Sequence, residues 1–220
     1  MPILNKEEII NNTICFVKET LADAEGGHDW FHIERVWKNT KCIGAAEKID
    51  IFTAELGALL HDIADSKFHD GDEEIGPKTA RVFLLTQEIP EEIIDHVENI
   101  IRYISFKGSI EGQSWTSPEL DVVQDADRLD ALGAIGIART FNYGGFKGRA
   151  LYDPNIPPNL NMTKEEYKAS TAPTLNHFYE KLLLLQDKMN TKTGKEIAQK
   201  RHAYLESFLE QFLEEWEGRS

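Results

Sequence analysis

Apolar residues recur at intervals of three and four positions along most of this 220-residue chain, the spacing that gathers them on one face of an α-helix. A glycine pair at 26–27 ends the first such helix, and a second is predicted from about Asp29. The apolar run 54–65 predicts a third, buried helix. The inward face of the first helix is formed by Ile10, Ile14, Val17 and Leu21.

Prolines mark where later helices begin. Pro77 suits the first turn of a helix that runs to Thr86. Pro90 and Pro118 open two further helices in the same way, because a proline at the first helical position loses no hydrogen bond.

The C-terminal third combines a long loop with more helix. The segment 143–161 is rich in Gly and Pro and predicts a loop, with the preceding helix stopping at the glycine pair 144–145. Thr163 and Glu166 match the capping-box pattern of a helix start. Final helices are expected around 175–189 and 197–216. Because strand patterns and internal repeats are missing from the sequence, we predict an all-α, single-domain bundle of about eight to ten helices.

Charge and cysteine content narrow the classes of partner. Lys and Arg number 24 against 38 Asp and Glu, and the formal charge of −14 disfavours nucleic-acid polymers and anionic membranes as partners. A small anion remains compatible where local cations gather. Cys15 and Cys42 lie in apolar helical patterns and are expected to be reduced core residues. With neither a secretion signal nor a membrane span in the sequence, we expect a cytoplasmic protein.

Three His-Asp doublets occur, and one differs from the others in its surroundings. His61-Asp62 lies within the apolar run 54–65, whereas the doublets at 28–29 and 69–70 adjoin glycines and fit solvated turns. An imidazole and a carboxylate on a buried helix are costly unless they are paired or bound to a metal. The His61-Asp62 doublet therefore needs polar partners or a metal contributed from elsewhere in the chain.

His32 and Asp127 add a second imidazole and a second carboxylate from two other predicted helices. A metal coordinated from three helices is the simplest way to hold all four groups in one core, and helical bundles commonly build metal sites this way. A hydrogen-bonded core pair would explain the doublet alone, but the complete set favours a metal. Asp125 is the rival of Asp127. The candidate ligands are thus His32, His61, Asp62 and Asp127.

The order of a His, a His-Asp doublet and a distant Asp resembles the HD hydrolase superfamily of metal-dependent phosphohydrolases. His32 is similar to the first ligand of that family because the Arg-Val pair 35–36 follows it. Asp127 is similar to the last ligand because of its setting in the segment 126–129.

The resemblance extends over most of the chain. Segments 105–107 and 176–181 are similar to those of a bacterial subgroup of small HD proteins. The resemblance implies one HD-type helical domain over residues 1–220, with a metal-binding core at about 26–140 and C-terminal helices at 163–217 that complete the cleft.

Two nitrogen and two oxygen ligands suit one divalent transition metal. We favour Mn²⁺, while Ni²⁺, Fe²⁺, Co²⁺, Zn²⁺ and Mg²⁺ remain open. His69 and His96 could hold a second ion, as extra histidines do in related proteins; a solvated turn and a capped helical position are the alternatives.

Three further residues are candidates for catalysis. Asp65 stands where several similar HD enzymes carry a Glu that handles protons, although its shorter side chain could instead orient a ligating His. Lys67 and Arg128 could neutralise charge that develops on a phosphoryl group.

Substrate contacts are expected from basic and aromatic residues. Lys107, His177 and Lys181 could hold phosphates, with a solvated surface as the alternative for each. His177 and Lys181 lie four apart on one helix face and are preferred to the loop residue Lys147. Tyr143 could stack on a nucleobase.

The expected function is therefore hydrolysis of a phosphate bond in a small substrate, with a nucleotide favoured. Pyrophosphate release from a nucleoside triphosphate and dephosphorylation of a nucleotide both fit. A cyclic-nucleotide phosphodiesterase and a non-catalytic module that senses metal and nucleotide are the alternatives. A homodimer is compatible with the sequence.

Overall fold

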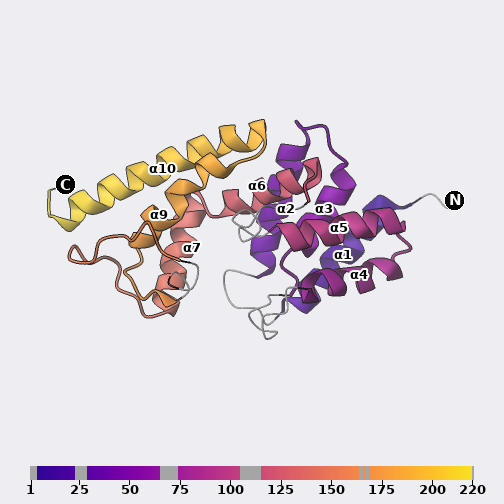
Figure 1. Cartoon of the computed structure of the whole chain (residues 1–220), viewed down its shortest axis with the longest axis horizontal. Helices are drawn as coiled ribbons and strands as arrows, with labels where there is room; N and C mark the ends of the chain where they lie inside the picture. The colour runs from indigo at the N-terminus through magenta and orange to yellow at the C-terminus, as the bar shows by residue number, and fades with distance from the viewer. Residues whose placement is uncertain are drawn as a thin grey trace. The chain divides into compact units, whose positions relative to one another are not determined.

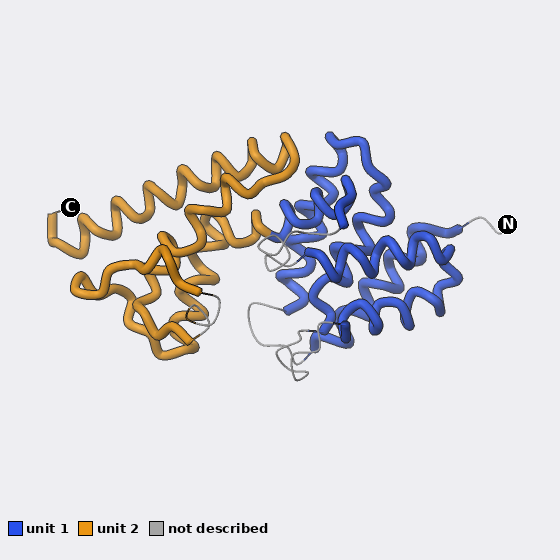
Figure 2. Tube along the Cα trace, viewed as in Figure 1, with its two compact units in different colours: residues 1–127 blue, residues 128–220 orange. Residues whose placement is uncertain are grey.

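The computed structural model describes residues 4–22, 29–64, 74–104, 115–163, 166 and 169–219. All regular secondary structure in these ranges is helical, which confirms the predicted all-α fold. The chain forms two compact units, residues 1–127 and 128–220 (Figure 2). The expectation that residues 1–220 form one domain stays a prediction.

The first unit is a bundle of helices (Figure 1). Asn5, Asp29 and Asp50 each cap the helix that follows by accepting a backbone N–H in its first turn. The helices are α1 (Lys6–Thr20), α2 (Trp30–Gly44), α3 (Ile51–Leu60), α4 (Ile75–Thr86), α5 (Glu91–Tyr103) and α6 (Pro118–Asp130), whose last turn continues into the second unit.

Helix α3 is the centre of the first unit and packs against α1, α2 and α5. Leu56, Leu59 and Leu60 are fully buried there, as the apolar run in the sequence predicts. Gly57 permits the close approach of α5, since a Cβ at this position would lie only 2.9 Å from Ile100 Cγ2.

Ion pairs hold α4 beside α5. The Arg81 guanidinium contacts three carboxylates of α5, those of Glu91, Asp95 and Glu98. At the other end of α4, Arg102 donates two hydrogen bonds to Glu74, at 2.8 and 2.7 Å. These hydrogen bonds lower the pKa of Glu74 and raise that of Arg102. The pairs fix the register of the two helices.

The second unit has an aromatic core. Phe141 of α7 (Gly133–Phe146) lies 5.8–6.1 Å, between ring centres, from Phe178, Phe208 and Phe212. The helices are α7 (Gly133–Phe146), α9 (Asn176–Glu180) and α10 (Lys192–Trp216), with 3₁₀ turns at Leu182–Leu184 and Gln186–Lys188.

Several helix boundaries match the sequence prediction, and others do not: α3 already ends at Leu60, and α10 begins at Lys192, five residues earlier than expected. Helix α4 ends at Thr86, α5 follows Pro90, and α6 begins at Pro118, as predicted. Thr163 and Glu166 form the expected reciprocal capping bonds. The helix expected at 175–189 is instead the short α9 and two 3₁₀ turns, because the chain breaks at Lys181 with φ −142°.

The predicted helix stop at 144–145 is also wrong, since α7 continues to Phe146. Gly144 serves packing, because a Cβ there would lie 2.1 Å from Thr174 Oγ1. The turn out of the helix falls at Gly148, whose φ of +65° favours glycine.

Both cysteines are exposed, contrary to the predicted core positions. Cys15 lies two positions from each of Thr13 and Val17, which are both buried, and so faces outward. Cys42 lies two positions from each of Thr40 and Gly44, which are both buried, and likewise faces outward. Among the described residues, no helix combines the length and apolarity that a membrane crossing needs.

Candidate metal centre

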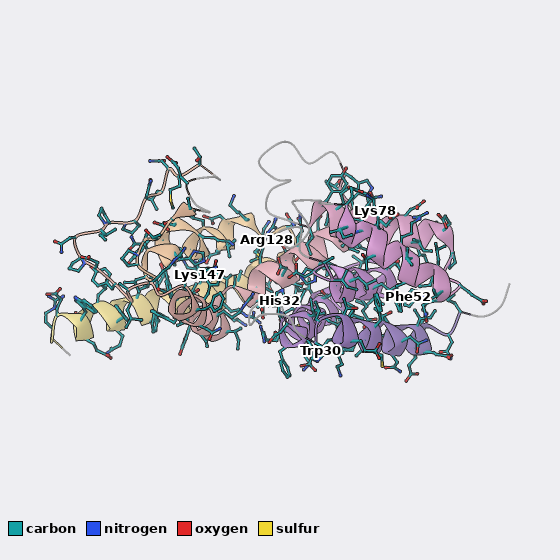
Figure 3. All side chains as sticks on the ribbon, turned by 90° about the horizontal axis from the view of Figure 1, so that it is seen from below. Trp30, His32, Phe52, Lys78, Arg128 and Lys147 are labelled. Atoms are coloured by element: carbon teal, nitrogen blue, oxygen red, sulfur yellow. The ribbon has the colours of Figure 1, made fainter. Side chains whose placement is uncertain are left out.

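His32 is placed by the start of α2. Asp29 is the N-cap of this helix, and its Oδ1 accepts a hydrogen bond from the His32 backbone N–H at 3.0 Å. The capped first turn turns the imidazole inward, where the residue is only 2 % exposed. His32 is labelled among the helices of the first unit in Figure 3.

His61 lies where α3 ends, as the C-cap residue with helical φ and ψ. Its Nδ1 is 2.8 Å from the carbonyl oxygen of Ala58. A carbonyl can only accept, so Nδ1 carries the proton and Nε2 presents its lone pair. The side chain is 4 % exposed. This hydrogen bond gives the imidazole the tautomer and orientation of a metal ligand.

Asp127 brings a carboxylate to the two imidazoles from α6. Its Oδ1 lies 3.6 Å from His32 Nε2 and 4.0 Å from His61 Nε2. The two imidazole rings are 5.3 Å apart between centres and meet edge to face at 70°. One donor atom from each of the three residues lies within 4.8 Å of the others.

The donor chemistry and two of the three donor separations fit a divalent ion. Donor atoms that bind one ion at about 2.0–2.2 Å each can be at most about 4.4 Å apart, and the two distances to Asp127 Oδ1, 3.6 and 4.0 Å, satisfy this limit. Imidazole nitrogen and carboxylate oxygen together suit Mn²⁺, Fe²⁺, Ni²⁺ or Zn²⁺. The Asp127 side chain is 39 % exposed, so the carboxylate side of the group is open to solvent.

The three-donor group includes Asp127 and not its rival Asp125, which is fully buried on the same helix. Asp62 follows His61 directly and is half-buried. The group found among the described residues does not contain the Asp62 carboxylate, and its role as a fourth ligand stays a prediction. His96, considered for a second ion, lies elsewhere: its Nε2 is 2.9 Å from Ser117 Oγ and 3.3 Å from Glu119 Oε2.

The remaining candidate residues fall in several places. Asp65, Lys67 and Lys107 lie outside the described residues. Arg128 donates a hydrogen bond to the backbone oxygen of Lys188, within the second unit. Tyr143, on α7, is 45 % exposed.

His177 and Lys181 belong to α9 and its C-cap in the second unit. Burial of the His177 imidazole lowers its pKa from 6.5 to about 3, and the positive charges of Lys181 and Arg149 act in the same direction. His177 is therefore neutral at pH 7.

The structure adds two residues that the sequence analysis missed. The positive charge of Arg149 contributes to the lowered pKa of His177. Arg149 also lies near Tyr143, with its Cζ 5.7 Å from the centre of that ring. Asn39 donates a side-chain hydrogen bond to the backbone oxygen of Ala126, next to Asp127. The sequence signal for Asn39 is weak, because it consists only of a polar residue in the middle of a predicted helix. No sequence pattern marks Arg149, which lies in a Gly- and Pro-rich segment.

Residues 30–132 match the HD domain family, and this stretch contains the whole three-donor group. Together with the relatives described next, the match establishes that the chain belongs to the HD-domain family, within the HD-superfamily hydrolases.

Similar proteins come from several bacteria. YpgQ of Bacillus subtilis (strain 168) is 36 % identical over 92 % of this chain and 91 % of its own. A crystal structure of an HD-superfamily hydrolase from Bacillus thuringiensis is 46 % identical, with a TM-score of 0.78 and coverage of 97 % of this chain and 99 % of that one. The structure of B. subtilis YpgQ in complex with ADP has a TM-score of 0.75 at 36 % identity, covering 96 % and 95 % of the two chains.

Proposed function

We propose that this protein is a metal-dependent phosphohydrolase that acts on a nucleotide. The observation that carries the proposal is the convergence of His32, His61 and Asp127, whose donor atoms lie within 4.8 Å of one another. Membership of the HD-superfamily hydrolases supports a hydrolytic reaction. The complex of the similar protein YpgQ with ADP supports a nucleotide as the ligand.

His32, His61 and Asp127 would hold one divalent ion, with Asp62 as the fourth ligand and Mn²⁺ as the favoured metal. When bound, such an ion acts as a Lewis acid toward a phosphoryl group and makes water a better nucleophile near neutral pH. The protein's own part begins with the hydrogen bond from His61 Nδ1 to Ala58 O, which holds Nε2 ready to donate its lone pair. Asp65, which lies outside the described residues, would move the proton of the attacking water.

Phosphate binding is assigned to basic residues, since a chain with a net charge of −14 needs local cations to attract an anion. His177 and Lys181 remain the preferred pair. Lys181 and Arg149 would supply the positive charge, and the neutral His177 would contribute only a hydrogen bond. Lys67, Lys107 and Arg128 are further candidates. Tyr143, with the Lys147 and Arg149 cations within 5.6 and 5.7 Å of its ring centre, would stack on the base.

A panel of substrates and metals tests the proposal. Protein stripped of metal with a chelator would be supplied with Mn²⁺, Mg²⁺, Ni²⁺ or Co²⁺ and incubated with mono-, di- and triphosphate nucleotides, cyclic AMP and simple phosphate esters. We expect release of phosphate or pyrophosphate from a nucleotide, identified by mass, only when metal is added. His61→Ala prepared in parallel should be inactive, which excludes a contaminating hydrolase.

Other outcomes would contradict the proposal in different ways. Cleavage of cyclic AMP alone would make the protein a phosphodiesterase. Binding of ADP without turnover under any of the four metals would make it a sensor. Equal activity of wild type and His61→Ala would remove the metal centre from the reaction.

A further inference from the structure

Two of the three donor residues are held by a polar contact to the backbone. Asp29 Oδ1 accepts from the backbone N–H of His32, and the Ala58 carbonyl accepts from His61 Nδ1. The first contact fixes the backbone turn that carries His32, and the second fixes the direction of the His61 imidazole. The Asp127 carboxylate is 39 % exposed and more open to solvent than either ring, so it needs such a constraint most.

Asn39 provides that contact from α2. It lies seven residues after His32, two helical turns along, so both residues lie on the same face of the helix. The Asn39 Nδ2 donates a hydrogen bond to the backbone oxygen of Ala126 at 3.3 Å. Ala126 is fully buried and directly precedes Asp127. Helix α2 therefore carries the donor residue His32 and, through Asn39, a hydrogen bond to the turn of α6 that carries the donor residue Asp127.

Asparagine is an unusual choice for the middle of α2. Its side chain competes with the backbone for hydrogen bonds, so it is less favourable than alanine in a helix interior. The half-buried Asn39 spans the gap from α2 to α6, where its amide meets a carbonyl. An alanine would improve the helix and lose this connection.

We propose that Asn39 is a positioning residue for the metal centre, holding the Asp127 turn of α6 against α2 so that the carboxylate faces His32 and His61. The inference rests on the proposed metal-dependent function and deepens it. A group of donors that already stands in its binding arrangement loses less conformational freedom when the ion binds. Asn39 touches neither the ion nor the substrate, and acts through Asp127.

The test measures metal affinity in the full-length protein, with Mn²⁺ alone as the ligand. Isothermal titration would compare wild type with Asn39→Ala after both are stripped of metal. We expect Mn²⁺ to bind the variant about 10- to 100-fold more weakly, as measured for residues that support metal ligands. The melting temperature of the metal-free variant should change little, because the gain in helix propensity offsets the lost hydrogen bond.

Gln124→Ala is the matched control. Gln124 lies on the same helix, three residues before Asp127, and its amide likewise donates to a backbone oxygen, that of Tyr103, at 2.9 Å. This bond and a longer one to the Ile104 backbone oxygen, at 3.5 Å, join α6 to the end of α5 and do not involve α2. Gln124→Ala should therefore bind Mn²⁺ with nearly the affinity of wild type. If Asn39→Ala does not fold, Asn39→Ser permits the same comparison with a smaller change.

Three results would overturn the inference. Wild-type Mn²⁺ affinity in Asn39→Ala would leave the asparagine with no part in the metal centre. Equal weakening in Asn39→Ala and Gln124→Ala would show a general loosening of α6. Wild-type protein that fails to bind Mn²⁺ would instead refute the proposed function, and with it the premise that Asn39 serves a metal.

Discussion

His177 should make the stability of the second unit depend on pH in the acidic range. Burial, together with the charges of Lys181 and Arg149, lowers its pKa from 6.5 to about 3 in the folded protein. As pH falls below 6.5, His177 therefore becomes protonated in the unfolded chain but stays neutral in the folded chain. The free energy of unfolding then decreases with falling pH, and this contribution levels off near pH 3, where both states are protonated.

The magnitude follows from proton linkage. One proton bound only by the unfolded state changes the free energy of unfolding by at most about 1.4 kcal/mol for each pH unit. Above pH 6.5 the imidazole is neutral in both states, and it adds no pH dependence there. Carboxylates titrate in the same acidic range, so the contribution of His177 must be measured as a difference between two proteins.

His177→Gln provides that difference, because glutamine occupies a similar volume and does not titrate. Urea unfolding followed by circular dichroism at pH 6.5, 5.5 and 4.5 would give the slope for each protein. We expect the wild-type slope to be steeper by up to about 1.4 kcal/mol per pH unit. Parallel slopes, or a steeper slope in the variant, would refute the assignment of a neutral, buried His177.

Three other predictions concern separate parts of the molecule. Gly57→Ala should lower the free energy of unfolding by about 1–3 kcal/mol in urea titrations, because the added Cβ would lie 2.9 Å from Ile100 Cγ2; unchanged stability would mean that α3 and α5 move apart freely. Lys181→Ala should lower kcat/KM for a nucleotide roughly 10- to 150-fold with bound metal unchanged, as expected for one lost phosphate contact; a match to wild type on every substrate would place Lys181 outside the site. Asp65→Asn should retain metal and fold but lose roughly 100-fold in turnover, and wild-type turnover would remove Asp65 from the mechanism.

The fold could be predicted largely from local patterns. Apolar spacing and the starts at Pro90 and Pro118 located helices correctly, because these signals act within one turn of the chain. The end of α7 could not be located this way. The glycine at 144 looks like a helix stop in the sequence, yet it is required by contact with Thr174, thirty residues further along the chain.

The residues of the candidate site likewise fall into those that the sequence could predict and those that it could not. His32, His61 and Asp127 could be proposed because each belongs to a recognisable motif, and the structure brings their donor atoms together. Asn39 and Arg149 could not be found from spacing. Their contacts, with Ala126 O and with the surroundings of His177, depend on how helices and loops far apart in sequence pack.

The central claim is that one divalent ion binds to His32, His61 and Asp127. Titration of metal-free protein with Mn²⁺, followed by calorimetry and confirmed by elemental analysis, tests it directly. The His202→Ala control removes a histidine whose Nε2 is 3.5 Å from Glu206 on α10. We predict one ion per chain in wild type and in His202→Ala, and none in His61→Ala. Equal Mn²⁺ binding by wild type and His61→Ala would contradict the assignment.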